Sequence, residues 1–192
     1  MISINLFTKC PYSTETKTRM KNFLSNEERI FLSEKMLINI LEEMNKVSKS
    51  VIKNVWAYPN LNSYNLTELV DKYNFITKTQ QGKNLDERMD YCLKRESSNN
   101  QKTIIFGSDI PTLDHVLLEN AIKSLSEYDV VLGPSLDGGY YLLGIKSYKK
   151  GMLKNRNNNL DSLIKFSVEN ELNYKLLDKL KDIDFPEDLL SI

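Results

Sequence analysis

Residues 103–113 read TIIFGSDIPTL and indicate how this chain folds. The first four residues are apolar or β-branched, which is typical of a central strand covered on both faces. Gly107 then lets the backbone turn sharply, and Asp109 follows beyond the end of the strand. Pro111 suits the entrance to a following helix. The stretch therefore predicts one strand of a mostly parallel sheet, with Asp109 either as a local cap or as a functional carboxylate.

A second stretch, VVLGPSLDGGYYLLG at residues 130–144, places another carboxylate after a strand. Asp137 precedes two glycines, and Asp-Gly is a common signal for a tight turn between two strands. A strand at 140–145 is therefore expected to run antiparallel to its predecessor. The functional alternative is that Gly138 and Gly139 let the backbone approach a ligand while Asp137 contacts a metal ion. Because a parallel sheet gathers functional groups at the carboxyl ends of its strands, Asp109 and Asp137 are expected to face one cleft.

The rest of the chain alternates strands and helices. Ser25 and Glu28 have capping-box spacing, and a helical period of apolar residues follows to Val47. Further strands are expected at 2–7, 50–58, 75–77, 102–106, 130–132 and 174–177, and helices at 66–73, 85–95, 113–125, 160–171 and 186–190. This alternation predicts a three-layer α/β/α sandwich with a mostly parallel sheet. Residues 1–192 are expected to form a single domain, because the chain shows neither repeats nor an internal linker.

Composition excludes several classes of protein. The 192 residues carry 26 basic and 26 acidic side chains, so a broad basic face for nucleic acid is not expected. The start of the chain is too short and polar for a secretory signal, and no apolar run approaches membrane-spanning length. Two cysteines do not make a disulfide framework, and with His115 as the single histidine a multi-histidine zinc site is excluded. We expect a cytoplasmic protein whose chemistry depends on Asp, Lys, Arg and a metal.

Basic residues follow the first predicted strand. Lys17 and Arg19 lie in the loop after it, where open α/β sheets commonly bind phosphate groups. Arginine offers a planar fork to phosphate oxygens and lysine a compact point charge, although a Lys-x-Arg pair is more often solvated surface. Asp109 and Asp137 are hard ligands that suit Mg²⁺ or Mn²⁺. Neither a Gly-x-Gly-x-x-Gly nor a P-loop sequence is present, so a dinucleotide enzyme and an NTPase are unsupported.

Taken in order, the segments FTKCPYSTETKTRM, QGKNLDERM, FGSDIPTL, DVVLGPSLDGGYYLLG and KDIDFPEDL resemble one family. They are similar to the small glycosyltransferase-like proteins of the nucleotide-diphospho-sugar transferase (GT-A) superfamily. That family has been labelled a domain of unknown function and linked to arsenosugar biosynthesis. More distantly, the segments resemble the molybdenum-cofactor and phospholactate guanylyltransferases. The resemblance spans nearly the whole chain and is most specific across Gly107–Pro111 and Leu132–Gly144.

The resemblance implies a GT-A fold, a nucleotide or nucleotide-sugar ligand, a small-molecule acceptor and a divalent metal. It implies that Asp109 and Asp137 hold the metal and, with Lys17, take part in catalysis. Residues on the nucleotide side are then Lys17, Arg19, Arg88, Gly107, Ser108, Gly138 and Gly139. One of Asp182 and Asp184, near the end of the chain, is a further candidate for the same cleft.

Three departures from the family pattern stand out. Ser13 and Thr14 replace a Pro-Gly pair before Lys17, and Asp86 replaces a glycine before Glu87. Asp86 is expected to add negative charge beside the phosphate site. An Asn-rich stretch at 154–159 replaces Trp-Ser-Thr and leaves the acceptor open.

Three functions are compatible with these features. The leading one is a metal-dependent transferase that uses a nucleotide-diphospho-sugar donor. The second is a guanylyl- or cytidylyltransferase that acts on a phosphorylated small molecule. The third is a nucleotide-binding module that has lost turnover.

Overall fold

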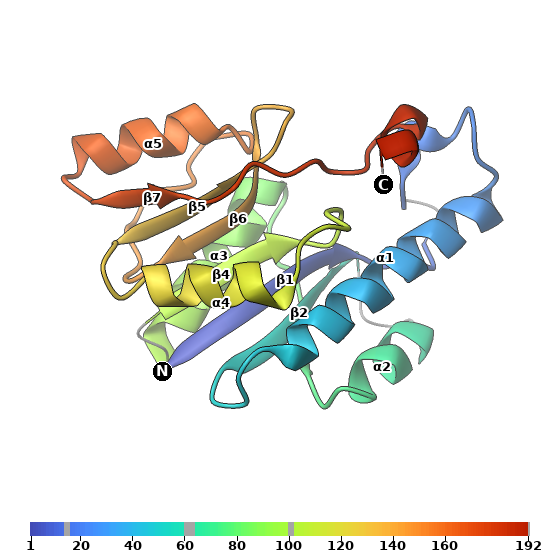
Figure 1. The fold of residues 1–192 in the computed structure, drawn as a ribbon, viewed down its shortest axis with the longest axis horizontal. Helices are drawn as coiled ribbons and strands as arrows, with labels where there is room; N and C mark the ends of the chain where they lie inside the picture. Colours follow the sequence, from blue (N-terminus) through green and yellow to red (C-terminus); the bar gives the residue numbers. More distant parts are fainter. Residues whose placement is uncertain (14–15, 60–63, 100–101, 192) are drawn as a thin grey trace.

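The computed structural model describes residues 1–13, 16–59, 64–99 and 102–191. Within these residues, seven strands form one sheet in the order β3-β2-β1-β4-β6-β5-β7 (Figure 1). The strands are β1 (Ile2–Lys9), β2 (Ile52–Tyr58), β3 (Ile76–Thr79), β4 (Lys102–Gly107), β5 (Val130–Pro134), β6 (Tyr140–Ile145) and β7 (Tyr174–Leu176). Strand β6 runs antiparallel to both neighbours, β4 and β5, and the other pairs are parallel. The mostly parallel sheet and the antiparallel hairpin after Asp137 are both confirmed.

Helices cover both faces of the sheet. They are α1 (Asn26–Lys46), α2 (Tyr64–Asp71), α3 (Leu85–Asn99), α4 (His115–Ser124) and α5 (Leu160–Glu169), with short 3-10 turns at Thr18–Met20 and Pro186–Ser191. Helix α1 begins with the predicted capping box, in which Glu28 N–H donates to Ser25 Oγ and Ser25 N–H donates to Glu28. The turn at Pro186–Ser191 packs against residues just before α1 and in its first half, so the carboxyl end of the chain lies near the beginning of α1 (Figure 1).

Alternate residues of the central strands divide the core into two layers. Ile104 and Phe106 of β4 pack with α1, α2 and α4, whereas Ile105 packs with α3 and α5. This alternation follows from the pleat, in which successive side chains point to opposite faces. The three-layer α/β/α arrangement is therefore confirmed, and it leaves the carboxyl ends of β1, β2 and β4 open at one edge.

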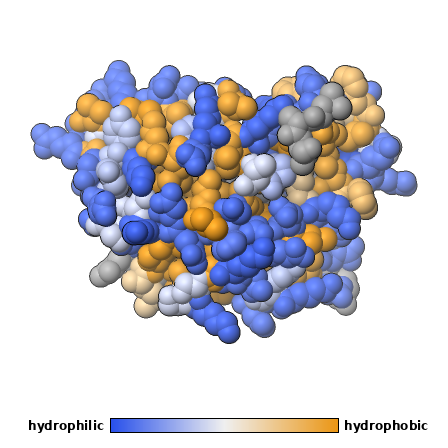
Figure 2. Space-filling view, viewed as in Figure 1, coloured by the Kyte–Doolittle hydropathy of each residue, from blue (hydrophilic) through white to orange (hydrophobic). Residues whose placement is uncertain are grey.

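The outer surface mixes side chains of both kinds. Hydrophilic residues are spread over the face seen in Figure 2, with hydrophobic ones between them. No helix in the described ranges is both long and apolar enough to cross a bilayer. Both cysteines are buried and free.

Candidate active site

A cleft of about 630 Å³ runs across the end of the sheet at which β1, β2 and β4 terminate. Its wall is formed where strands end or begin: Lys9 ends β1, Tyr58 ends β2, Gly107 ends β4 and Tyr140 starts β6. Asp109 and Asp137 both line it, and so do Asp182 and Asp184 near the end of the chain. The expectation that the two aspartates face one cleft is therefore met, and both C-terminal candidates join them.

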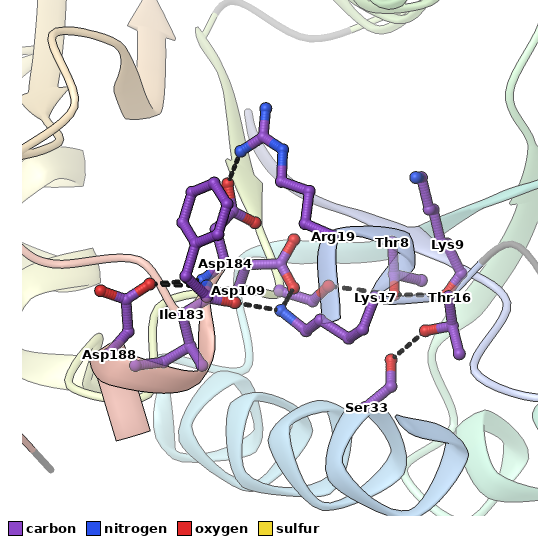
Figure 3. A network of polar contacts seen from close by, with 12 residues as sticks. Thr8, Lys9, Thr16, Lys17, Arg19, Ser33, Asp109, Ile183, Asp184 and Asp188 are labelled. Atoms are coloured by element: carbon purple, nitrogen blue, oxygen red, sulfur yellow. Dashed lines mark hydrogen bonds and ion pairs between the residues drawn. The ribbon is translucent and has the colours of Figure 1, made fainter. Parts of the chain in front are cut away.

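Lys17 and Asp109 form an ion pair at this edge (Figure 3). The side chain of Lys17 is only 5% exposed, whereas that of Asp109 is 51% exposed toward solvent. Lys17 Nζ also donates to the carbonyl oxygen of Ile183 at 2.6 Å, and Ile183 N–H donates to the carbonyl oxygen of Asp109 at 2.9 Å. Lys17 itself lies in the left-handed region, with φ 45°. Three segments that are far apart in sequence thus meet at one ammonium group.

Arg19 lies two residues after Lys17 and lines the cleft. Its guanidinium pairs with the carboxylate of Asp184 and lies 5.5 Å from the centre of the Phe185 ring. The Arg19 side chain is 59% exposed, so the pair is open to water. Lys17 and Arg19, the two basic residues of the Lys-Thr-Arg segment, therefore both contact carboxylates at the place where a phosphate was expected.

Hydrogen bonds hold the Asp137 turn in place. Asp137 Oδ1 accepts hydrogen bonds from Ser135 Oγ and from Gly139 N–H, the latter at 2.9 Å. Burial alone would raise the pKa of Asp137, but these hydrogen bonds outweigh it and hold the pKa below its usual value. Gly138 has φ +90°, a conformation that side chains rarely adopt. The turn therefore combines the hairpin role with an ionised carboxylate facing the cleft.

Four carboxylates crowd one region of the cleft. Burial, followed by the charge of Asp137, raises the pKa of Asp182. Burial also raises the pKa of Asp184, and the charges of Asp109 and Asp137 add to it while Arg19 opposes it. In the described part of the chain, no group of three or more His, Cys, Asp or Glu side chains is already arranged around a metal position. The site thus has concentrated negative charge without a preformed protein cage.

Two further residues, Arg88 and Gln80, line the cleft near the ends of β2 and β3, and only Arg88 was predicted from the sequence. Arg88, which the family resemblance indicated, stacks its guanidinium 4.0 Å from the centre of the Tyr58 ring. Gln80 was not singled out from the sequence, yet its amide nitrogen donates to the carbonyl oxygens of Thr8 and Trp56 at 3.1 and 2.8 Å. The position of Gln80 directly after β3 was the available signal. Both residues line the cleft beside the ends of β2 and β3.

The remaining predicted residues lie where the strand ends place them. Gly107, Gly138 and Gly139 line the main cleft. Ser108 lines an adjoining hollow with Lys17, and its Oγ donates to Thr8 Oγ1 at 3.1 Å. His115 lies away from the cleft at the start of α4, where its ring and its backbone N–H contact Glu43 Oε2. Its contacts are structural.

Asp86 differs from expectation. It is buried, and its Oδ2 accepts hydrogen bonds from the backbone N–H groups of Arg156 and Asn157 at 2.7 and 2.9 Å. Its charge thus anchors the Asn-rich loop and does not line the cleft. This contact was not predictable from the sequence, because the loop lies 70 residues away. Thr14, the other replaced glycine, lies outside the described residues.

Solved structures share this architecture. A crystal structure described as a nucleotide-diphospho-sugar transferase from Desulfovibrio desulfuricans G20 matches with a TM-score of 0.88, at 23% identity over 98% of this chain and 84% of that one. A 4-diphosphocytidyl-2C-methyl-D-erythritol synthase from Anaerococcus prevotii matches with a TM-score of 0.66, at 12% identity over 100% and 93%. The predicted nucleotide-diphospho-sugar transferase fold is confirmed by these matches.

Sequence relatives carry a consistent name. A 2-phospho-L-lactate guanylyltransferase from Methanocaldococcus vulcanius is 29% identical over 92% of this chain and 78% of its own length. One from Methanobrevibacter smithii is 31% identical over 72% of this chain and 57% of its own length. These names agree with the prediction of a transferase. A family model described as an uncharacterized protein conserved in bacteria, DUF2064, matches residues 46–158, which is more than half of the chain, and the chain therefore belongs to the DUF2064 family.

Proposed function

We propose that the chain is a nucleotidylyltransferase, which moves a nucleoside monophosphate from a nucleoside triphosphate to the phosphate group of a small acceptor. The observation that carries the proposal is the array of Arg19, Asp109 and Asp184 in the cleft of about 630 Å³, with Lys17 paired to Asp109 from the adjoining hollow. Guanylyltransferase relatives and a cytidylyl-type structural neighbour support it. The whole of residues 1–192 would act as one transferase domain.

A divalent metal fits the donor set. Asp109, Asp137 and Asp182 offer hard oxygen ligands. Burial first, and then the charge of its carboxylate neighbours, raises the pKa of Asp182, and a bound cation would offset that negative charge. Mg²⁺ is commonly held by one or two carboxylates together with substrate phosphates, so a preformed protein cage is not needed. A structural neighbour, Rv0371c of Mycobacterium tuberculosis, was solved with manganese (TM-score 0.55, 10% identity). Asp109 and Asp137 would hold the ion, which when bound would neutralise charge on the phosphates.

The three basic residues of the site would have different roles. Arg19 forms a direct ion pair with Asp184 that is exposed to solvent. Because exposed ion pairs are weak, Arg19 can turn to a phosphate at little cost in free energy. Lys17 is fixed by Asp109 and by the Ile183 carbonyl oxygen, so its main part is to position Asp109. Arg88, held on the Tyr58 ring, lies on the side of the cleft expected to take the nucleoside.

The reaction needs few groups from the protein. An oxygen of the acceptor phosphate attacks the α-phosphorus of the triphosphate, and the bond from that phosphorus to the β-phosphate oxygen breaks. Pyrophosphate leaves with its electron pair. Because the attacking phosphate oxygen is already ionised at neutral pH, no general base is required. This agrees with the placement of His115 far from the cleft.

A titration with GTP tests the proposal. GTP with Mg²⁺ or Mn²⁺ should bind the wild-type protein, and the Asp109→Asn variant should bind at least about tenfold more weakly in the presence of metal. Asp71→Asn, at the exposed end of α2, is the matched control and should bind as the wild type does. Equal affinity of wild type and Asp109→Asn would remove Asp109 from the site, and absence of binding for GTP and CTP alike would overturn the proposal.

Transfer of a sugar from a nucleotide-diphospho-sugar is the second candidate. The structural match to the Desulfovibrio protein favours it, because that protein is described as a nucleotide-diphospho-sugar transferase. The two reactions differ in their products. Pyrophosphate release supports nucleotidyl transfer, release of a nucleoside diphosphate supports sugar transfer, and tight binding without turnover supports a binding module.

A further inference from the structure

The hydroxyl group of Tyr140 is a buried polar atom without a hydrogen-bond partner in the described part of the chain, on a residue that lines the cleft. Tyr140 starts β6 and is 5% exposed, and its hydroxyl has no hydrogen-bond partner among the described residues. Buried tyrosine hydroxyls usually have one. Burial, and next the charge of Asp86, raises the pKa of Tyr140, so the group stays protonated and can donate. Because Tyr140 also lines the cleft, a ligand atom can supply the partner.

Residues Asn157–Asn159, which we call the asparagine loop, lie in the same cleft as Tyr140. Asn157, Asn158 and Asn159 line the same cleft, and Asn157 and Asn158 have φ 52° and 56°. Asparagine tolerates this left-handed conformation better than most residues. Non-glycine residues in such conformations cluster at ligand sites, where the surrounding structure holds them. The loop therefore has the backbone of a fixed binding element.

Two sets of contacts hold this loop in place. On one side, Asp86 accepts hydrogen bonds from the N–H groups of Arg156 and Asn157. On the other side, Leu160 N–H donates to the Gly138 carbonyl oxygen at 3.2 Å, and a Cβ at Gly139 would lie 2.7 Å from the amide nitrogen of Asn158. The loop thus packs directly on the Asp137 turn, so whatever it binds lies close to that aspartate.

The side chains that the asparagine loop brings to the cleft beside Tyr140 are neutral amides. Arg19 pairs with Asp184, and Arg88 stacks on Tyr58 at the other side. Arg156 is turned away, since its Nε donates to the Met152 carbonyl oxygen and its guanidinium lies over Phe166. The side chains that line the cleft beside Tyr140 are amides and the apolar Leu85 and Met89, while the charge of the buried Asp86 carboxylate acts on the Tyr140 hydroxyl. A carboxylate placed there would lose its hydration without gaining a cation, and Asp86 would repel it, so its binding would be costly.

We propose that Tyr140 and Asn157–Asn159 form a subsite for a neutral, hydroxyl-bearing part of the acceptor, as in a polyol phosphate or sugar phosphate. Amide and phenol groups pair with hydroxyl groups as both donors and acceptors, and the apolar side chains of Leu85 and Met89 suit the carbon backbone of such a molecule. This inference rests on the proposed function, because that function requires the acceptor to carry a phosphate group. It makes Tyr140 and the asparagine loop determinants of acceptor specificity, with no part in the chemistry.

The experiment compares two acceptors that differ in their hydroxyl groups. Glycerol 3-phosphate and ethyl phosphate are titrated into the wild-type protein, first alone and then with a non-hydrolysable GTP analogue and Mg²⁺ bound. The wild type should bind glycerol 3-phosphate about tenfold more tightly than ethyl phosphate. Tyr140→Phe and the double variant Asn157→Gly with Asn158→Gly should each remove most of that difference and leave ethyl phosphate binding unchanged.

Asn155→Gly is the matched control for the loop. Asn155 also has a left-handed backbone, with φ 57°, but does not line the cleft. Glycine keeps this backbone and removes only the amide, so the control should bind both acceptors as the wild type does. Equal wild-type affinity for the two acceptors, or unchanged preference in both site variants, overturns the subsite. Loss of GTP-analogue binding with the preference retained overturns the proposed function instead and leaves the subsite standing.

Discussion

Lys17 Nζ donates a hydrogen bond of 2.6 Å to the carbonyl oxygen of Ile183, which joins the segment after β1 to the end of the chain. The same ammonium group pairs with Asp109 beyond β4 (Figure 3). Ile183 is itself buried with Met20 and Met36 in a small apolar cluster. The cleft edge is therefore built from three segments whose contacts depend on one another.

Replacing Lys17 with methionine should lower stability. The change removes a charged hydrogen-bond donor from a side chain that is 5% exposed, and such bonds contribute about 1.5–3 kcal/mol. We expect a loss of about 2 kcal/mol in the free energy of unfolding, measured by urea titration. Lys21→Met, at an exposed position, is the control and should change stability by less than about 0.5 kcal/mol. An unchanged urea midpoint for Lys17→Met would mean that the ammonium group does not hold these segments together.

Replacing Arg19 with alanine should give the opposite pattern. The Arg19–Asp184 pair is exposed, so its loss should change stability by at most about 1 kcal/mol. If Arg19 contacts phosphate, its removal should weaken GTP binding by about tenfold or more, since charged hydrogen bonds to phosphate are strong. Calorimetric titration with GTP measures the affinity. Weaker binding that is matched by an equally large loss of stability would indicate a folding defect and count against the phosphate role.

The Glu43 contacts predict a dependence of stability on pH. Hydrogen bonding from Lys46, followed by that from His115, lowers the pKa of Glu43 to about 2 despite partial burial. The pKa of Glu43 in the unfolded chain is about 4.3, so the ionised carboxylate stabilises the folded state above that pH. This contribution to the free energy of unfolding is lost as the pH falls toward about 2. Glu43→Gln should therefore be less stable than the wild type by a constant amount above about pH 5, with a difference that shrinks in more acidic solution.

Urea titrations of the two proteins between neutral pH and the acid limit measure this difference. Glu119→Gln, on the exposed surface of α4, is the control and should show no such trend. A difference that does not change as the pH falls would show that Glu43 is not ionised with a lowered pKa in the folded protein.

Gly139 should tolerate alanine poorly. A Cβ there would lie 2.7 Å from the side-chain amide nitrogen and 3.0 Å from the carbonyl oxygen of Asn158, so the Asn158 side chain would have to turn and its carbonyl oxygen to shift slightly. Overpacking of this kind costs about 1–3 kcal/mol. Gly107→Ala, which meets nothing within 4 Å, is the comparison for stability and should cost less. Equal stability of the two variants by urea titration would show that the loop is not packed against the turn.

The main features of the fold were predictable because they depend on local patterns. Strand β4 is apolar on both faces, and the Asp-Gly turn before β6 leaves room only for an antiparallel return. Asp109 and Asp137 were found because both follow strands, and strand ends meet at one edge of such a sheet.

The contacts of individual charges were not predictable. Asp86 was expected beside a phosphate but holds a loop 70 residues away, and Lys17 was expected to face a ligand but is enclosed by Asp109 and Ile183. Tyr140 looked like an ordinary strand residue, and the lack of a hydrogen-bond partner for its buried hydroxyl among the described residues became evident only from its surroundings. Such contacts depend on segments that approach in three dimensions, which residue type and spacing do not record.

Product analysis by phosphorus NMR tests the central claim most directly. The wild-type protein is incubated with GTP or CTP, Mg²⁺, and glycerol 3-phosphate or 2-phospho-L-lactate. We predict that the triphosphate signals give way to pyrophosphate and to a new diphosphate linkage between nucleoside and acceptor, and that Asp109→Asn gives neither. Formation of nucleoside diphosphate and orthophosphate in their place, or no turnover by a protein that binds the nucleotide, would contradict nucleotidyl transfer.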